Sequence, residues 1–199
     1  MASTDIAFSP SVKAIQARKG SRAAYAKVEA RGGWDDTITP ELAAFLAEQD
    51  SVFLATASAA GQPYIQHRGG PPGFLRVLDA HTLAFADFAG NRQYITLGNL
   101  AENPRAHLFA MDYLHRRRIK LWGTARVVDD DPALLGSLMP DGYAAKPEQA
   151  IVFTVAAWDA NCPQHIPQKV NVADVAGTVE HLQNRVAEVE AELARLRTG

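Results

Sequence analysis

The hydrophobic pattern of the central part of the chain predicts short strands joined by turns. Residues 51–58 form a buried-type run, and a turn around Gly61 leads to a second, alternating run at 64–68, which together are typical of a hairpin. Further runs of this kind cover 73–79, 82–88, 105–113, 117–130 and 150–159. Because few helices separate these six or seven strands, the pattern predicts a mainly β protein built as an antiparallel barrel or sandwich.

Helices are expected where the period changes to 3.6 and start signals are present. Thr39 is a capping residue and Pro40 suits the first helical position, so a helix that starts at Pro40 is predicted in the 37–50 stretch. Shorter helices are expected near 23–30, within 91–104, and after Asp131, where Pro132 follows a candidate cap. The helices are thus expected to flank or connect the strands.

The C-terminal tail has a different pattern from the rest of the chain. Its apolar residues are spaced alternately by three and four, which is a heptad seam and predicts a long helix. The spacing favours pairing with another helix, most simply that of a second copy of the chain, and the alternative is a helix docked on its own barrel. The seam consists of Val172, Val175, Val179, Leu182, Val186, Val189, Leu193 and Leu196.

These patterns divide the chain into three expected parts. Residues 1–39 are expected to form an N-terminal helical extension, residues 40–170 the barrel domain, and residues 171–199 the C-terminal amphipathic or coiled-coil helix. A chain of 199 residues is long enough for one domain with a substantial core and an appendage.

Composition excludes several classes of protein. The net charge of −2 gives no electrostatic reason to expect nucleic acid or an anionic membrane as partner. A single cysteine excludes an internal disulfide and a cysteine-rich zinc site. No apolar run approaches the roughly 20 residues that span a bilayer, and no signal peptide is visible, so a cytoplasmic location is expected.

The turn after the 82–88 strand is a candidate site for an anion. Asn91, Arg92 and Gln93 lead from a glycine-containing turn into a helix, where backbone N–H groups and a guanidinium can bind a phosphate. The alternative is a helix cap beside an ordinary surface arginine. These two interpretations remain equally supported by local chemistry.

Two other polar stretches bear on the same question. On the 64–68 strand, Gln66 and Arg68 share one face and His67 lies on the other, so Arg68 is a second candidate for the anion. Arg117 and Arg118 stand at the entrance of the strand at 117–130, where they form either a solvated patch or part of a ligand site.

The order of these segments resembles a known family. A "FLATAS" and "GQP" hairpin, the strand and turn "TLAFADFAGNR", then "NLAENPRAHL" and "RIKLWGTARVV" are similar to the pyridoxamine 5'-phosphate oxidase-related, FMN-binding split-barrel family. The resemblance spans about Pro40 to Trp158. It implies a homodimer of split β-barrels with two FMN molecules at the subunit interface.

The resemblance also implies roles for individual residues. Arg68, with the Asn91–Gln93 turn, matches the phosphate-binding positions, and Arg118 matches a position that contacts the flavin ring or the ribityl chain. Asp87 and Phe88 match positions at the isoalloxazine edge. The complete set of candidate cofactor-binding residues is Gln66, His67, Arg68, Asp87, Phe88, Asn91, Arg92, Gln93, Arg117, Arg118, Gln164 and His165.

The segment "NCPQHIPQ" departs from the true oxidases of the family, which end in a segment rich in Trp and Arg. Cys162 and His165 could be read as a nucleophile and its base, but no other part of an acyl-transfer site is present, and a metal site lacks ligands. The favoured interpretation is a stiff, proline-bracketed segment over the flavin edge, in which Gln164 and His165 donate or accept hydrogen bonds and Cys162 is a small buried residue. The pattern is similar to a subgroup distinct from true pyridoxamine-phosphate oxidases.

The expected function is therefore that of an FMN-dependent oxidoreductase or flavin reductase. It would act on an unidentified small molecule and would take electrons from a nicotinamide or from a reduced substrate. The alternative is a flavin- or haem-binding module that senses, stores or delivers its cofactor without turnover. Members of the family usually have a basic residue at the position of Gln93. The phosphate is therefore expected to depend more on Arg68 and Arg92 for its binding.

Overall fold

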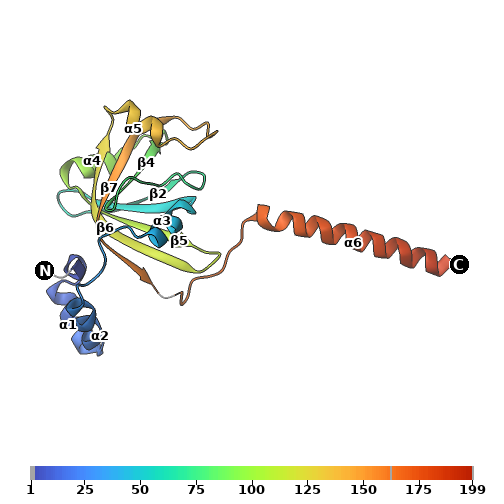
Figure 1. The fold of residues 1–199 in the computed structure, drawn as a ribbon, viewed down its shortest axis with the longest axis horizontal. Helices are drawn as coiled ribbons and strands as arrows, with labels where there is room; N and C mark the ends of the chain where they lie inside the picture. Colours follow the sequence, from blue (N-terminus) through green and yellow to red (C-terminus); the bar gives the residue numbers. More distant parts are fainter. Residues whose placement is uncertain (1–2, 162, 199) are drawn as a thin grey trace.

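The computed structural model describes residues 3–161 and 163–198, and its centre is an antiparallel sheet of seven strands (Figure 1). The strand order is β2-β1-β5-β6-β7-β4-β3. The mainly β fold predicted from the sequence is confirmed. The strands are β1 (Ser51–Ala57), β2 (Pro63–Gly69), β3 (Arg76–Val77), β4 (Thr82–Phe88), β5 (Arg105–Asp112), β6 (Arg117–Val128) and β7 (Pro147–Asn161).

The sheet curves so that its two ends approach each other. β2 forms one edge of the sheet and β4 lies next to the other edge, yet the side chains of Arg68 on β2 and Asp87 on β4 are in contact. The space enclosed by this curvature is filled by apolar side chains from the alternate positions of the strands. These include Leu54, Phe85, Leu108, Leu121 and Phe153, none of which is more than 1% exposed.

Two helices, α3 (Pro40–Ala47) and α4 (Ile95–Glu102), pack on the barrel. Thr39 caps α3 by accepting a hydrogen bond from the N–H of Leu42 at 3.2 Å, and Pro40 occupies the first position, as expected. α4 is tied to β1 by the buried side chain of Asn99, whose Nδ2 donates to Thr56 Oγ1 at 3.0 Å. A further helix, α5 (Pro132–Ser137), is capped by Asp131, whose Oδ1 accepts a hydrogen bond from the N–H of Leu134.

The N-terminal segment forms η1 (Ser3–Ile6), α1 (Pro10–Lys19) and α2 (Arg22–Ala30). It docks on the outer face of the sheet through Trp34, whose ring stacks on Trp122 of β6 at 4.7 Å between centroids. Phe8 packs edge-on against Trp34 at 5.0 Å, and Trp158 Nε1 donates to the carbonyl oxygen of Thr37 at 2.9 Å. Apolar stacking and one indole hydrogen bond therefore hold this segment in place.

Two local features differ from the pattern expected for regular strands. The strand expected at 73–79 is reduced to two residues, because Gly73 has a φ of 86° and Phe74 and Leu75 turn into the core. On β6, the pairing with β7 shifts register between Trp122 and Gly123. A side chain at position 123 would overlap the backbone of β7, so only glycine fits there.

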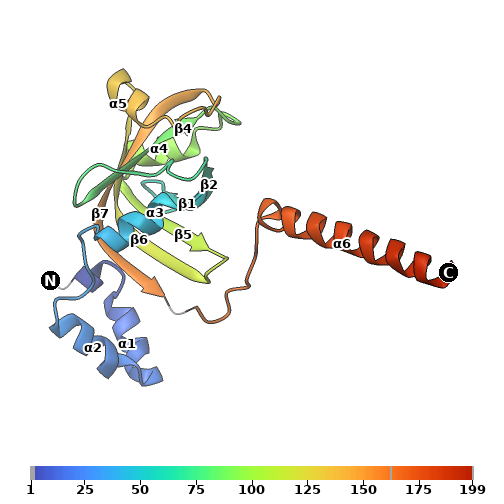
Figure 2. The same ribbon diagram turned by 45° about the vertical axis from the view of Figure 1, so that its right-hand side comes forward.

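The C-terminal helix α6 (Val172–Thr198) projects away from the barrel (Figures 1 and 2). All eight residues of the heptad seam are exposed, from 39% for Val175 to 82% for Val172. The predicted helix is thus present, and it is not docked on its own barrel. Among the described residues, no helix has the length and apolarity needed to cross a membrane.

Candidate functional site

The contact between β2 and β4 forms a buried polar cluster. Arg68 Nη1 lies 3.0 Å from Asp87 Oδ1, and Gln149 Nε2 of β7 donates to Asp87 Oδ2 at 2.6 Å. The side chain of Arg68 is 13% exposed and that of Asp87 is 6% exposed. Arg68 Nε is buried and has no hydrogen-bond partner among the described residues. A buried guanidinium with an unsatisfied N–H is a site where an acceptor from a ligand would relieve a desolvation cost.

Burial has the largest effect on the carboxyl group of this cluster. Burial raises the pKa of Asp87 and Glu148 adds to the rise, whereas the charge of Arg68 and the hydrogen bond from Gln149 oppose it. Asp87 therefore accepts a proton more readily than an exposed carboxyl. An anion that engaged Arg68 would meet less repulsion from this carboxyl than from a fully charged one.

The turn between β4 and α4 borders the cluster. Arg92 and Tyr94 both have left-handed backbone, with φ of 58° and 55°, and Asn91 Oδ1 accepts from the N–H of Gln93 at 3.2 Å. No side chain caps the first turn of α4. Arg92 is mostly exposed, and its Nε lies 3.6 Å from Glu148 Oε1. Backbone N–H groups and an exposed guanidinium are thus presented beside Arg68, as an anion requires.

Two small hollows meet at the Arg68–Asp87 pair. One, of about 40 Å³, is lined in part by Gln66, Asn91 and Arg92, and the other, of about 80 Å³, by His67 and Phe88. Both are far below the roughly 300–1,000 Å³ of a complete small-molecule site. Within one chain they therefore suit a group the size of a phosphate and not a whole flavin nucleotide.

Gln66 and His67 occupy opposite faces of β2, as the alternation predicts. Gln66 Oε1 accepts from Thr96 Oγ1 of α4 and from Tyr64, each at 3.2 Å, so its orientation is set by neighbours. His67 is exposed and packs edge-on against Phe53 at 5.8 Å between ring centroids.

Arg118 and His165 line a separate cavity of about 480 Å³ on the outer face of the sheet. Its other walls are largely apolar and include Phe53, Phe109 and Met111. The cross-strand partner of Arg118 is Met111, so the sheet itself separates Arg118 from Arg68 within one chain. Arg118 Nε is buried and, like that of Arg68, lacks a partner within the described part of the chain.

The remaining candidates lie apart from these two places. Arg117 forms ion pairs with Asp112 at 2.7 Å and Glu48 at 3.0 Å, and its guanidinium lies over the ring of Phe45. Gln93 is exposed on the turn and lines neither hollow, and Gln164 is exposed after β7. Cys162 lies outside the described residues.

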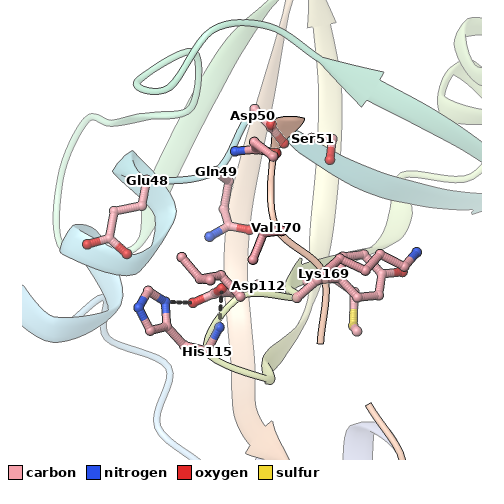
Figure 3. Close-up of a pocket in the computed structure, with 12 residues that line it drawn as sticks. Glu48, Gln49, Asp50, Ser51, Asp112, His115, Lys169 and Val170 are labelled. Atoms are coloured by element: carbon pink, nitrogen blue, oxygen red, sulfur yellow. Dashed lines mark hydrogen bonds and ion pairs between the residues drawn. The ribbon is translucent and has the colours of Figure 1, made fainter. Parts of the chain in front are cut away.

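A larger cavity, of about 530 Å³, lies between α3, the β5–β6 hairpin and the segment that leads to α6 (Figure 3). Three carboxylates, Glu48, Asp50 and Asp112, line it. Burial alone would raise the pKa of Asp112, but hydrogen bonds from His115 and Arg117 outweigh it and lower that pKa. Arg117 pairs with two of these carboxylates and Lys169 also lines the cavity, so the charges there are largely compensated. The Arg68 cluster has a buried guanidinium N–H without a partner among the described residues, which makes it the better candidate for a phosphate.

Several residues of the Arg68 cluster were not predicted from the sequence. Glu148 and Gln149 lie near the start of β7, where they contact Arg92 and Asp87 respectively. Thr96 lies in α4 and donates to Gln66. Their sequence surroundings carry no local signal of a site. They could be found only once the pairing of β4 with β7 is known, because Asp87 is the register partner of Gln149.

Comparisons with known proteins agree with this fold. The model of the pyridoxamine 5'-phosphate oxidase family matches residues 38–162. HupZ from Group A Streptococcus is 21% identical, with 67% of this chain and 99% of HupZ covered at a TM-score of 0.50. No protein of curated function matches.

Two further solved structures show weaker likeness. An FMN-binding protein from Syntrophomonas wolfei is 11% identical, with 73% of this chain and 97% of that chain covered at a TM-score of 0.46. HutZ, the haem storage protein from Vibrio cholerae, is 15% identical, with 62% and 93% covered at a TM-score of 0.41. The match of the family model spans well over half of the sequence, and the chain belongs to the pyridoxamine 5'-phosphate oxidase family, with its split-barrel fold.

Proposed function

We propose that this protein is an FMN-binding oxidoreductase that acts as a homodimer on a small molecule. The observation that carries the proposal is Arg68, a nearly buried guanidinium whose Nε–H lacks a partner among the described residues and which borders the turn at 91–94. The family resemblance and the unsatisfied guanidinium N–H both support a cofactor phosphate at this place.

The phosphate would lie in the hollow between Arg68 and the 91–94 turn. Arg68 supplies a fixed charge, Arg92 an exposed and adjustable one, and the uncapped start of α4 supplies backbone N–H groups. The phosphate dianion would compete with Glu148 for Arg92. The existing ion pair between Arg92 and Glu148 is weak, because its atoms are 3.6 Å apart and the arginine side chain is exposed.

The flavin ring would need a second subunit. The hollow at Arg68 is too small for the ring, and Arg118 faces the opposite side of the sheet. Arg68 of one subunit and Arg118 of the other can serve the same FMN, and this arrangement explains why both guanidinium groups keep an unsatisfied N–H. The apolar cavity of Phe53, Phe109 and Met111 would then cover part of the ring, with His165 at its rim.

Bound FMN would supply the electron-transfer chemistry. The chain would supply orientation, exclusion of water by the apolar wall, and the positive charge of Arg118, which favours an anionic reduced ring. Because the cofactor carries the reactive atoms, the proposal needs no acid–base pair of side chains.

The proposal is tested by reduction under anaerobic conditions. The protein loaded with FMN is mixed with NADH or NADPH, and the visible absorbance of the oxidised flavin is followed. Bleaching, with recovery when air is admitted, is the expected result. FMN that stays oxidised with either nicotinamide would move the assignment to a module that binds its cofactor without turnover, and uptake of haem in place of FMN would contradict the cofactor.

A further inference from the structure

The apolar seam of helix α6 is left exposed by the described part of the chain. It has 27 residues, and every side chain described in it is exposed. Valine occupies five positions of the seam, and valine is a poor helix former in isolation. Because helices in proteins gain most of their stability from packing of an apolar face, this helix requires a surface that covers the seam.

The identities of the seam residues favour a two-stranded coiled coil. With Val172 at the first a position, the a series is Val172, Val179, Val186 and Leu193. The d series is Val175, Leu182, Val189 and Leu196. Three of the four a residues are β-branched and two of the four d residues are leucine, and β-branched residues at a with leucine at d fit the side-chain geometry of a parallel dimer.

The charges beside the seam favour the parallel direction. In a parallel, in-register pair, each g residue faces the partner's e residue five positions later. Arg185 then faces the partner's Glu190, and Glu192 faces the partner's Arg197. Two-fold symmetry repeats both contacts, so every charged e or g position meets its opposite charge.

The antiparallel direction loses this match. When Val172 is set opposite the partner's Leu196, the g positions face one another, and the two Arg185 side chains meet at the centre. Glu190 then faces an alanine, Ala176. Within the single chain Arg185 bonds Glu188 at 2.8 Å, but both are about two-thirds exposed, and such a pair is easily exchanged.

We propose that α6 pairs with α6 of a second copy as a parallel, in-register, two-stranded coiled coil. Its two-fold axis is compatible with a symmetric dimer of barrels, because an isologous pair has one axis for all its contacts. The pairing does not depend on FMN, so it stands or falls separately from the proposed function.

Disulfide trapping tests the direction and register. Leu196→Cys is made in the full-length chain together with Cys162→Ala, which removes the only native cysteine. This variant is equilibrated in a glutathione redox buffer. A disulfide-linked dimer is expected, because the parallel pair sets the two positions side by side. In the antiparallel pair they would be about 36 Å apart, from 24 residues at 1.5 Å each. Asn184→Cys, on the outer face, is the matched control and stays unlinked.

Charge exchange tests the predicted contacts in the same assay. Arg185→Glu in the Leu196→Cys protein places a glutamate opposite the partner's Glu190. The equilibrium constant for disulfide formation between the two chains should then fall about tenfold. Adding Glu190→Arg should restore it. No linkage through Leu196→Cys, or a double variant as weak as the single one, would overturn the proposal.

Discussion

Replacement of Arg68 by alanine removes the group on which the proposed cofactor site depends. The variant loses a guanidinium that is 13% exposed and lies 3.0 Å from Asp87. Hydrogen bonds to a charged group contribute about 1.5–3 kcal/mol, so the FMN dissociation constant should rise about 10- to 150-fold.

The same change also leaves Asp87 without its cation, and this must be separated from the loss of binding. The pKa of Asp87 is already raised by burial, so the unpaired carboxyl takes up a proton at less cost than an ordinary one. The double variant Arg68→Ala/Asp87→Asn removes the charge altogether. It should recover the stability that Arg68→Ala loses, but not the affinity for FMN.

Titration with FMN, followed by quenching of flavin fluorescence, measures the affinity, and urea unfolding measures the stability. Arg126→Ala is the control for charge, because Arg126 is exposed on β6 and contacts neither hollow. If the double variant binds FMN as tightly as the unaltered protein, the phosphate does not bind at Arg68 and the site is assigned wrongly.

Three further predictions concern the scaffold. Burial, and then the charge of Lys120, lower the pKa of His107 to about 4. In the unfolded chain the pKa of a histidine is about 6.5. The folded protein therefore has its full stability above that pH and loses part of it as the pH falls towards 4, because the unfolded chain then binds the proton more readily. After a discount for partial exposure, the free energy of unfolding should fall by about 1–2 kcal/mol over this pH range. His107→Gln should flatten the dependence of that free energy on pH, measured by urea unfolding, and an unchanged dependence would contradict the assignment. Gly123→Ala should destabilise by about 3 kcal/mol or more, because the added carbon meets backbone, whereas Gly136→Ala, with open space around it, should change little; equal melting temperatures would refute the close approach. Thr39→Ala should cost about 1 kcal/mol in unfolding free energy through loss of the α3 cap, and no change would show that the cap contributes nothing.

The strands and α3 could be predicted because their signals are local. A short apolar run followed by a turn at Gly61 marks β1, and a capping threonine with a following proline marks α3. α1 was not predicted, although Ser9, Pro10 and Gly20 mark its ends, because it has no apolar face. The strand predicted at 73–79 is shorter than expected, because Phe74 and Leu75 are both buried in the core and do not follow the alternation of a strand.

The site could be predicted only in part, for a related reason. Asn91 and Arg92 could be named as candidates because a turn before a helix is a local signal. The contact of Arg68 with Asp87 depends on closure of the sheet between β2 and β4, which no local pattern encodes. The separation of Arg118 from Arg68 within one chain follows from strand alternation and the pairing register. It is the basis of the proposal that two subunits share one cofactor.

The most direct test of the account is the identity and amount of cofactor that the purified protein binds. The protein is saturated with FMN in excess, freed of unbound ligand, and denatured to release what remains. The account predicts a flavin spectrum before denaturation and one FMN per chain afterwards. No retained flavin, or a haem absorption band after the same treatment with haem, would contradict it.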